Sequence, residues 1–340
     1  MVLPKATIIW INYNSKNILD VVLNSLRGVF ELDYPDLEII IIDNGSTDGS
    51  FEIIREFISN VKNKVVKQVK ILRLKENFGF ITANNLALKL RDRGSRYIVL
   101  LNNDAEPYTS SLIELVEILM SLREEKVAGI QGIIATWDKK HVDNMGFIVD
   151  ELLFSHALYR GQPINTPKKP HLCTFISGAY SVYDIDYLIK INANEKIFDE
   201  PFFAYFDDKI LGFKAWSKKY KLISYPLPAA RHYGSASFRR TSAFKLYLTT
   251  RNFLVTLNRT RNHRYRLLVR ILYIIRRIVE ATLYPNNTSL IDNYISIIRG
   301  LIDSYKYTKY LSYEIDLSSI PLRKMNILDV IRSLLSPLQD

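Results

Sequence analysis

The sequence predicts an α/β fold with a mostly parallel central sheet flanked by helices. Short apolar runs at 7–11, 37–42, 69–74 and 98–101 are typical of strands buried on both faces of a sheet. Amphipathic stretches separate these runs, so strand and helix alternate four times within about 105 residues. Such alternation is typical of parallel βαβ units with right-handed crossovers.

Each element has its own local signal. Ser15 or Asn14 can cap the first helix, and Asp48 or Ser50 the second. The helix at 110–123 carries a clear apolar face. The further elements are expected in this order: helices over 84–91 and 110–123, a strand over 127–134, an irregular hairpin with a long loop over 135–171, a strand over 175–183, a helix over 210–219 and a strand over 221–225.

The composition is that of an ordinary globular protein, with 48% apolar and 24% charged residues in a chain of 340. The single cysteine, Cys173, excludes an internal disulfide and indicates a reducing compartment. Its apolar neighbours favour a place in the core over a role as nucleophile. No secretory signal and no run of about 18 uncharged apolar residues is visible, which predicts a cytoplasmic protein without a spanning helix.

The net charge of +11 is unevenly distributed along the chain. From residue 238 onward 17 Lys and Arg stand against 7 Asp and Glu, a balance of +10, which leaves +1 for the first 237 residues. Eleven basic residues and no acidic one lie between Arg239 and Arg277. This asymmetry predicts that the C-terminal region meets an anionic partner.

Two strands end in polar residues that suit a ligand site. The apolar run before Leu101-Asn102-Asn103-Asp104 stops abruptly, and the carboxyl end of a strand is where an open α/β sheet binds ligands. Asp104 is therefore predicted to face a cleft, with oxygen ligands for a hard divalent cation. Asp43 opens a turn, 43–50, that is rich in Gly, Asn and Asp and exposes amides and carboxylates. The alternative for both segments is a plain polar turn.

Seven segments in this order resemble the family 2 inverting glycosyltransferases, and among them the rhamnosyltransferase-like group. No one segment is decisive, but their order is specific, and together they span residues 6–237. They are Ile11-Asn12-Tyr13-Asn14-Ser15, the stretch 42–50, Asn77-Phe78-Gly79-Phe80 with Asn84 and Asn85, Leu101 to Asp104, the stretch 198–203, Tyr205-Phe206-Asp207-Asp208, and His232 with Gly234 and Ser237.

The resemblance implies a GT-A fold, a UDP- or dTDP-sugar donor and a Mg²⁺ or Mn²⁺ ion. An inverting transfer needs a carboxylate that takes the proton of the acceptor hydroxyl and a positive centre that stabilises the leaving diphosphate. Asp207 and Asp208 match the acidic pair of the family, with Asp208 as the base and Asp207 as helper or acceptor ligand. Asp104 and His232 match its metal-binding positions.

The resemblance also implies a set of residues around the donor. Asp43 would grip uracil or thymine, Asn14 would lie near the same nucleotide, and Asn77 and Asn84 would line the donor cleft. Asn102 stands where the family usually has its first metal acid, so the cation is expected to bind weakly without donor.

Structural alternatives stand beside these roles. The acidic pair could simply begin a helix, where negative charge is favourable. His232 could be a structural histidine with its hydrogen bonds satisfied. Asn77 and Asn84 could be helix caps. The sequence departs from the family pattern after the acidic pair, where Lys209-Ile210-Leu211 and Lys214 replace its usual acid and arginine. The departure leaves the acceptor contact open.

The predicted organisation is a catalytic domain at 1–237 and a basic, amphipathic helical region at 238–340. In the latter, Arg264, Arg266, Arg270, Arg276 and Arg277 interleave with apolar residues at helical spacing. Such a face can lie on an anionic membrane, with packed accessory helices or a contact in a homo-oligomer as alternatives. Nucleic acid is not expected, because no recognition module accompanies the basic residues. Arg251-Asn252 resembles an Arg-Asn pair found beyond the family's histidine.

The function predicted from the sequence is a metal-dependent inverting transfer of rhamnose or another hexose to a glycan or lipid-linked glycan, at the cytosolic face of a membrane. A sugar nucleotidyltransferase on a related fold is the enzyme alternative, although the Gly-rich, Arg-containing entry loop that favours it is absent near Ile11. A catalytically silent scaffold that binds nucleotide or glycan is the alternative from a different class.

Overall fold

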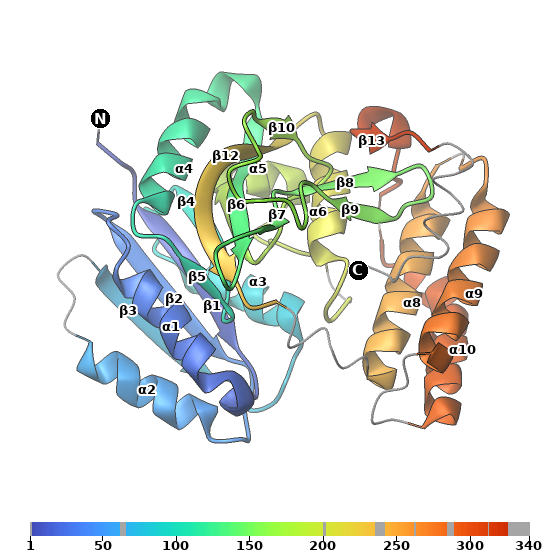
Figure 1. The fold of residues 1–340 in the computed structure, drawn as a ribbon, viewed down its shortest axis with the longest axis horizontal. Helices are drawn as coiled ribbons and strands as arrows, with labels where there is room; N and C mark the ends of the chain where they lie inside the picture. Colours follow the sequence, from blue (N-terminus) through green and yellow to red (C-terminus); the bar gives the residue numbers. More distant parts are fainter. Residues whose placement is uncertain are drawn as a thin grey trace.

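The structure is a computed structural model and describes residues 2–61, 66–199, 202–234, 242–261, 263–283, 289–311 and 313–325. Its main sheet consists of β1 (Ala6–Asn12), β2 (Leu37–Asp43), β3 (Val66–Arg73), β4 (Tyr97–Asn102), β5 (Ala105–Pro107), β6 (Val127–Thr136), β7 (Val142–Asn144), β10 (His171–Leu172), β11 (Tyr180–Asp184) and β12 (Lys221–His232). Within the described residues the strand order is β10-β12-β6-β11-β4-β1-β2-β3, with β5 paired to β12 and β7 to β6 (Figure 1).

The helices are α1 (Leu19–Phe30), α2 (Ser50–Asn60), α3 (Phe80–Leu90), α4 (Ser111–Ser121), α5 (Ile185–Asn192), α6 (Asp207–Ser217), α8 (Ala243–Arg259), α9 (Arg266–Leu283) and α10 (Leu290–Thr308). Short 3₁₀ helices cover Lys16–Ile18, Arg123–Glu125 and Leu317–Ser319. A second, small sheet joins β13 (Leu322–Arg323), β8 (Phe147–Asp150) and β9 (Ser155–Ala157).

Alternate residues of the central strands enter two different cores. In β1, Ile8 and Trp10 pack into the core beneath α1 and α4, whereas Ile9 packs into the core beneath α3, α5 and α6. Both faces of the strand are thus buried, which is why its sequence is a continuous apolar run instead of an alternating one.

Strands β1 to β4 form the parallel part of the sheet that the sequence predicts. β1 pairs in parallel with both β2 and β4, and β2 pairs in parallel with β3. β11 is antiparallel to β4 and β6, while β12 runs parallel to β6. The result is the expected mostly parallel sheet with an antiparallel strand inside it.

Several predicted bounds are wrong, because contacts far along the chain decide them. The stretch 135–171 forms four short strands, β7 to β10, instead of one hairpin with a long loop. Asp150 Oδ1 shapes the β8–β9 turn by accepting from the amides of Leu152 and Phe154 at 2.8 and 2.9 Å. The strand expected from Phe175 begins only at Tyr180. β12 continues past the expected end, through Pro226 and Pro228, with shifts in its pairing at that point.

The three C-terminal helices lie together at one side of the molecule, next to α6 (Figure 1). α8 is buried over most of its surface, which its sequence pattern did not predict. Phe253 of α8 stacks on Tyr273 of α9 with ring centres 3.7 Å apart, and both join a core cluster with Phe154 and Phe213. The predicted boundary at residue 237 lies outside the described residues, and this cluster takes side chains from both sides of it.

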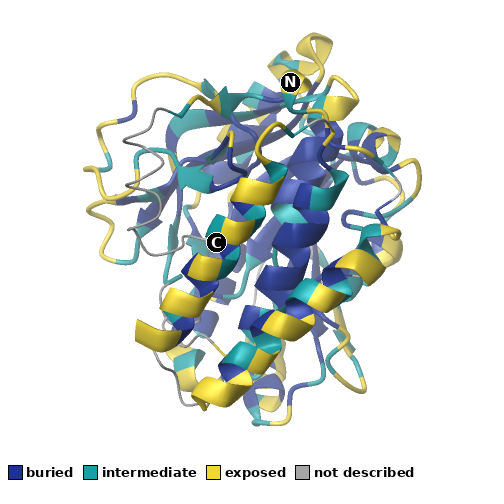
Figure 2. Ribbon diagram, turned by 90° about the vertical axis from the view of Figure 1, so that its right-hand side faces the viewer, coloured by how far each residue is buried: buried dark blue, intermediate teal, exposed yellow. Residues whose placement is uncertain are grey.

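The expected arrangement of the basic residues on α9 is also wrong. Arg276 and Arg277 are buried, and Arg277 contacts Glu280 and the Tyr273 hydroxyl. Arg270 bonds to Tyr305 and Asn258. Exposed positions lie along α9 and α10 on the side of the molecule that faces the viewer in Figure 2. Most of these exposed residues are aliphatic. The guanidinium of Arg277 finds its partners within α9, and that of Arg270 finds them on α8 and α10.

Gly212 lies where α6 approaches the segment before β11. A Cβ atom at this position would lie 2.3 Å from the Thr174 carbonyl oxygen and 2.6 Å from Phe175 Cβ. Because backbone atoms yield only at a cost, Gly212→Ala should lower the free energy of unfolding by about 1–3 kcal/mol in a urea titration. Gly94→Ala is the matched control, since its Cβ would meet only the Asp92 carboxylate, at 3.2 Å. Equal stability of both variants would contradict this close approach.

Candidate active site

Three parallel strands end side by side and bring their last residues together. Asn12 at the end of β1 is paired with Asp43 at the end of β2, and Ile11 is paired with Asn102 at the end of β4. Because the carboxyl ends of parallel strands share one edge of a sheet, the polar residues that follow each strand become neighbours. Asp43 and the segment 102–104 therefore lie at the same edge, as the sequence predicts.

Asp43 is fully buried and fully engaged in hydrogen bonds. Its Oδ1 accepts from Asn12 Nδ2 at 2.9 Å, and its Oδ2 accepts from the Ser46 amide at 3.0 Å. The Asn12 amide also contacts the hydroxyls of Ser46 and Ser50 at 3.2 and 3.3 Å. These contacts fit the alternative in which Asp43 shapes the turn, and a contact with a base stays a prediction.

Asn14 and Asn77 hold the turn 43–50 from two sides. Asn14 Oδ1 accepts from the Thr47 amide at 2.8 Å, and Asn14 itself adopts a left-handed backbone with φ of 43°. Asn77 Oδ1 accepts from Asn44 Nδ2 and from the Gly79 amide, both at 2.9 Å. Both predicted residues therefore lie at the strand edge. Asn77 lies just before α3 but does not cap it, because the N-cap is Gly79 and no side chain in the described part of the protein accepts from the first turn.

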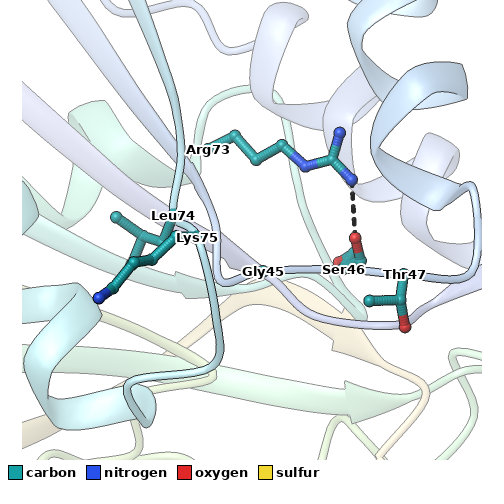
Figure 3. Close-up of a pocket in the computed structure, with 6 residues that line it drawn as sticks. All are labelled: Gly45, Ser46, Thr47, Arg73, Leu74 and Lys75. Carbon is teal, nitrogen blue, oxygen red and sulfur yellow. Dashed lines mark hydrogen bonds between the residues drawn. The ribbon is translucent and has the colours of Figure 1, made fainter.

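A pocket of about 400 Å³ opens beside this turn, between Gly45-Ser46-Thr47 and Arg73-Leu74-Lys75 (Figure 3). Arg73 Nη2 donates to the Ser46 carbonyl at 2.8 Å, and Arg73 Nε lies 3.7 Å from Asp43 Oδ2. The guanidinium also lies over the Phe51 ring, 4.8 Å from its centre. The pocket thus has a cationic wall next to the predicted base-binding carboxylate.

His232 lies between two carboxylates. Its Nε2 is 3.2 Å from Asp104 Oδ1, and its Nδ1 is 3.1 Å from Asp143 Oδ2. The strand pairing of β12 with β5 brings His232 opposite Ala105, the residue after Asp104. The Tyr233 amide also donates to the Asp104 carbonyl at 2.9 Å, so backbone contacts hold the two segments together.

The three groups shift one another's pKa. Burial alone would lower the pKa of His232, but the two carboxylates outweigh it and raise that pKa to about 10. Burial alone would raise the pKa of Asp104 and Asp143, but the contact with His232 outweighs it and lowers the pKa of both. The cluster therefore holds an imidazolium between two carboxylates.

Asp104 and His232 together fit part of the coordination shell of a divalent cation. Carboxylate oxygen and the nitrogen of a neutral imidazole are both ligands of Mn²⁺, and the two atoms are close enough to reach one ion, which would displace the proton that His232 carries in its absence. Within the described ranges, no group of three or more His, Cys, Asp or Glu side chains is arranged to hold a metal. A cation held here would thus complete its coordination with phosphate oxygens and water.

The acidic pair begins α6 and lies near the end of β4. The Gly178 amide donates to Asp208 Oδ2 at 2.8 Å, and the next carbonyl, of Ala179, accepts from the Asn102 amide at 3.2 Å. Asp208 Oδ1 is buried without a hydrogen-bond partner in the described structure. A carboxylate oxygen with free lone pairs at this edge can accept a proton from a ligand hydroxyl.

Burial raises the pKa of both Asp207 and Asp208, and the neighbouring Asp207 charge raises that of Asp208 further. The helix N-terminus and the Gly178 amide favour the charged form, but burial outweighs them. The alternative of an N-terminal helix pair thus describes the position correctly. The shift of the pKa toward neutrality is what a general base requires.

A short chain of contacts joins the predicted residues. Asp43 accepts from Asn12, and Asn12 Oδ1 accepts from Asn103 Nδ2 at 3.2 Å. Asn103 precedes Asp104, which contacts the imidazole described above. Asp208 reaches the same strand end through the Gly178–Ala179 segment. One edge of the sheet therefore brings together groups that are far apart in the sequence.

Two predicted residues have a different setting. Asn84 is buried within α3, where its Nδ2 donates to the Phe80 carbonyl at 2.9 Å, a contact internal to the helix. Asn102 is half-buried at the end of β4 and contributes its backbone to the edge. Ser237, part of the histidine motif, lies outside the described residues.

Sequence reasoning missed Asn12, Arg73 and Asp143 as site residues. Asn12 and Arg73 each end a strand beside Asp43, and this position at the carboxyl edge was a usable signal. Asp143 lies in the stretch interpreted as an irregular loop and meets His232 only through the pairing of β7 and β12 with β6. No local pattern marks such a contact.

Comparison with known proteins gives relatives among the glycosyltransferases. The chain is 29% identical over 117 residues to a protein of Bacillus subtilis named as a teichuronic acid biosynthesis glycosyltransferase, TuaG, and the match covers 34% of this chain and 42% of TuaG. It is 35% identical over 88 residues to the poly-β-1,6-N-acetyl-D-glucosamine synthase of Staphylococcus epidermidis, which covers 26% of this chain and 19% of that enzyme. The matches thus span less than half of these relatives.

Solved structures share the fold. TarS 1–349 of S. aureus in complex with UDP-GlcNAc has a TM-score of 0.53 at 16% identity, over 89% of this chain and 81% of that one. The mannosyltransferase PcManGT of Pyrobaculum calidifontis, in complex with GDP-Man and Mn²⁺, has a TM-score of 0.53 at 15% identity, over 91% and 84%. These likenesses confirm the expected GT-A fold with its helical C-terminal region.

A family model described as glycosyl transferase family 2 matches residues 7–191, more than half of the chain. The match covers the strand edge from Asp43 to Asp104. The chain therefore belongs to glycosyl transferase family 2.

Proposed function

We propose that the protein is a metal-dependent inverting glycosyltransferase that moves a sugar from a nucleoside diphosphate to a glycan or lipid-linked glycan. The observation that carries this proposal is the grouping of Asp43, Asp104, Asp208 and His232 around the ends of β1, β2 and β4. Family membership supports the reaction class, and this grouping supports the assignment of roles.

The donor would lie along the strand edge, from the pocket beside Arg73 to the Asp104–His232 pair. Arg73 and Asp43 would meet the nucleoside, with Asn14 and Asn77 around them and Asn102 toward the diphosphate. Asp104 and His232 would hold Mg²⁺ or Mn²⁺, which when bound neutralises the charge of the leaving diphosphate. The complex of PcManGT with GDP-Man and Mn²⁺ supports a nucleotide-sugar and a divalent ion.

Asp208 would accept the proton of the acceptor hydroxyl while Asp207 positions the acceptor. Among the described residues, Asp208 Oδ1 is buried without a hydrogen-bond partner, and burial and the Asp207 charge raise the pKa of Asp208. Both observations support the assignment, because a raised pKa increases the proton affinity of the carboxylate. The attacking oxygen and the departing diphosphate would lie on opposite faces of the sugar. A single displacement of this kind inverts the anomeric carbon.

The donor is proposed to carry UDP or dTDP with rhamnose or another hexose. TarS in complex with UDP-GlcNAc supports a uridine nucleotide on this fold, and the S. epidermidis relative is named for a poly-N-acetylglucosamine product. A panel of sugar nucleotides tested for thermal stabilisation identifies the donor, because a ligand in excess raises apparent stability by mass action. When the donor is incubated with the protein and Mn²⁺, slow release of UDP or dTDP supports the transferase. Pyrophosphate exchange supports a nucleotidyltransferase, and the absence of any reaction supports a scaffold.

The outer face of α9 and α10 supports a membrane as the place of action. Most of the exposed residues of these helices are aliphatic: Leu267, Leu268, Ile271, Ile275, Ile278, Val279 and Leu283 on α9, and Leu290, Ile291, Ile295, Ile298 and Ile302 on α10. An apolar face of this extent costs free energy in water and is typical of an interaction site. Within the described ranges, no helix is both long and apolar enough to cross a bilayer.

Cations and tyrosines gather at one end of this face. The bond from Arg270 to Tyr305 brings the start of α9 next to the end of α10, where Tyr265, Tyr310 and Lys309 are also exposed. Tyr and basic residues at the border of an apolar face suit the headgroup level of an anionic leaflet. We therefore propose peripheral contact with the cytosolic membrane face, with helix packing in a homo-oligomer as the alternative.

Asp208→Asn should lower kcat by about 10²–10⁴-fold, because it removes the base, while donor affinity measured by thermal stabilisation stays close to the wild-type value. Asp20→Asn, an exposed change on α1, is the matched control with expected wild-type turnover. Retained turnover in Asp208→Asn would remove this residue from its role.

The activity should be lost on the acidic side at a higher pH than an ordinary aspartate would give. The pKa of Asp208 is raised by burial and by Asp207, and the base must be ionised, so kcat/KM falls as the pH decreases through that raised pKa. The measurement is a kcat/KM profile over pH with saturating metal. A constant kcat/KM down to the ordinary aspartate range would contradict the raised pKa.

Chelation should abolish transfer, and Mn²⁺ should restore it. Asp104→Asn removes the one carboxylate proposed to touch the ion, so the Mn²⁺ concentration for half-maximal activity should rise by at least about 10-fold. Asp138→Asn, an exposed change near β7, is the control. Full activity of the wild-type protein after exhaustive chelation would exclude the proposed role of the ion.

The protein should sediment with anionic vesicles at low salt, and the double variant Ile275→Asp/Ile298→Asp should reduce the bound fraction more than about 10-fold, since each change places a charge on the apolar face. Val2→Asp, at a position 92% exposed, is the control. Indifference of the wild-type protein to lipid at low salt would refute the membrane contact, and a change of oligomeric state in the double variant would favour the homo-oligomer.

A further inference from the structure

The loop that leads into the acidic pair has an unusual backbone. Phe203, Tyr205 and Phe206 have φ of 69°, 66° and 69°, in the left-handed region that residues other than Gly rarely adopt. Large aromatic residues adopt it only where surrounding contacts enforce it. The loop therefore depends on other parts of the chain for the conformation that places Asp207 and Asp208 at the start of α6.

Every carbonyl from Phe202 to Tyr205 accepts a hydrogen bond from outside the loop. The Phe202 carbonyl accepts from Arg251 Nη2 at 2.7 Å, and the Phe203 carbonyl accepts from the Ile81 amide at 3.2 Å. The carbonyls of Ala204 and Tyr205 both accept from Asn252 Nδ2 at 2.9 Å. Three of these four contacts come from two adjacent side chains of α8.

Arg251 and Asn252 are themselves held in place. Both are buried, and Arg251 Nε donates to Asn252 Oδ1 at 2.9 Å, which fixes the amide so that its nitrogen faces the loop. The Arg251 guanidinium lies over the rings of Tyr307 and Tyr247, 4.3 and 5.2 Å from their centres. Burying a charged group without hydrogen-bond partners is costly, so the Phe202 carbonyl is an important acceptor for this guanidinium.

Asp208 has little else to fix it. Its Oδ2 accepts a hydrogen bond from the Gly178 amide, and its Oδ1 has no hydrogen-bond partner among the described residues. The aim of that free oxygen therefore follows from the backbone of the loop and the first turn of α6. A shift of about 1 Å in a reacting group is enough to lower a rate by on the order of 100-fold.

We infer that Arg251 and Asn252 are positioning residues that hold the loop 202–206 in its strained shape and thereby aim Asp208 at the acceptor. The inference rests on the proposed role of Asp208 as the base. It gives the C-terminal region a part in the chemistry through the loop, without contact between α8 and the sugar.

The opposite side of the loop faces Gly79 and Ile81, beside the residues proposed to bind the donor. A Cβ atom on Gly79 would lie 2.6 Å from the Phe203 carbonyl oxygen, and Ile81 donates to the same oxygen. Asn77, which holds the turn after β2, accepts from the Gly79 amide at 2.9 Å. The loop is thus held between the donor side of the site and α8, so its position ties the base to the donor.

The test compares Asn252→Ala with Asn258→Ala, an asparagine of the same helix whose Nδ2 donates to Thr308 Oγ1 and not to the loop. Asn252→Ala should lower kcat on the order of 100-fold, with a much smaller change in donor KM, while Asn258→Ala keeps the wild-type kcat. Tyr307→Leu, which removes a ring from the Arg251 guanidinium, is a milder second variant. It should lower kcat in the same direction, and it keeps the test decisive if Asn252→Ala does not fold.

The pH profile of kcat/KM distinguishes a change in the position of Asp208 from a general loss of protein stability. Among the described residues, the ionisable neighbours of Asp208 are Asp207 in α6 and Tyr183 in β11. A loosened loop admits water to the acid pair, so the acidic limb of kcat/KM should move to lower pH in both loop-directed variants and not in Asn258→Ala.

The outcomes separate the two proposals. Wild-type kcat and an unmoved pH profile in folded Asn252→Ala and Tyr307→Leu, alongside an inactive Asp208→Asn, would overturn the positioning role alone. Full turnover in Asp208→Asn would overturn the assignment of the base, and the positioning role with it.

Discussion

The site depends on the pairing of polar groups at a buried edge of the sheet. A carboxylate without donors in this place would cost several kcal/mol, so Asp43 is compatible with the fold only because Asn12 and the Ser46 amide donate to it. The same bonds shape the turn 43–50, and Asn12 Oδ1 extends the pairing by accepting from Asn103 Nδ2, next to Asp104. One set of hydrogen bonds thus joins the proposed nucleoside end of the site to its proposed metal end.

Two kinds of carboxylate environment stand at this edge. Asp104 meets an imidazolium, and that contact outweighs burial and lowers the pKa of Asp104. Asp208 has one backbone donor and a second acid beside it, and its pKa is raised. Environments that push the pKa values of two carboxyl groups apart in this way favour different roles for them. The difference fits the proposal that Asp104 stays ionised as a ligand while Asp208 exchanges a proton.

The parts of the fold that follow from local pattern could be predicted from the sequence. Continuous apolar runs gave β1, β2 and β4, and the polar residues directly after them, Asp43 and Asp104, lie where the sheet topology requires. Long-range pairing decides the rest. Asp143 meets His232 only through neighbouring strands, and β12 continues through two prolines because β6 pairs with it irregularly. The guanidinium of Arg270 donates to Tyr305 of α10, 35 residues further along the chain. A basic residue in a sequence carries no sign of such a partner.

The stack of Phe154, Phe253 and Tyr273 joins side chains from both sides of residue 237, the predicted end of the catalytic domain. Phe175 and Phe213, from the sheet side, share the same cluster. A shortened chain ending near residue 237 would uncover these rings together and leave the carbonyls of Ala204 and Tyr205 without Asn252. The C-terminal helices are therefore part of the folded core. Removing them would expose an apolar surface that is prone to aggregation and would leave the loop before α6 without its hydrogen-bond donors.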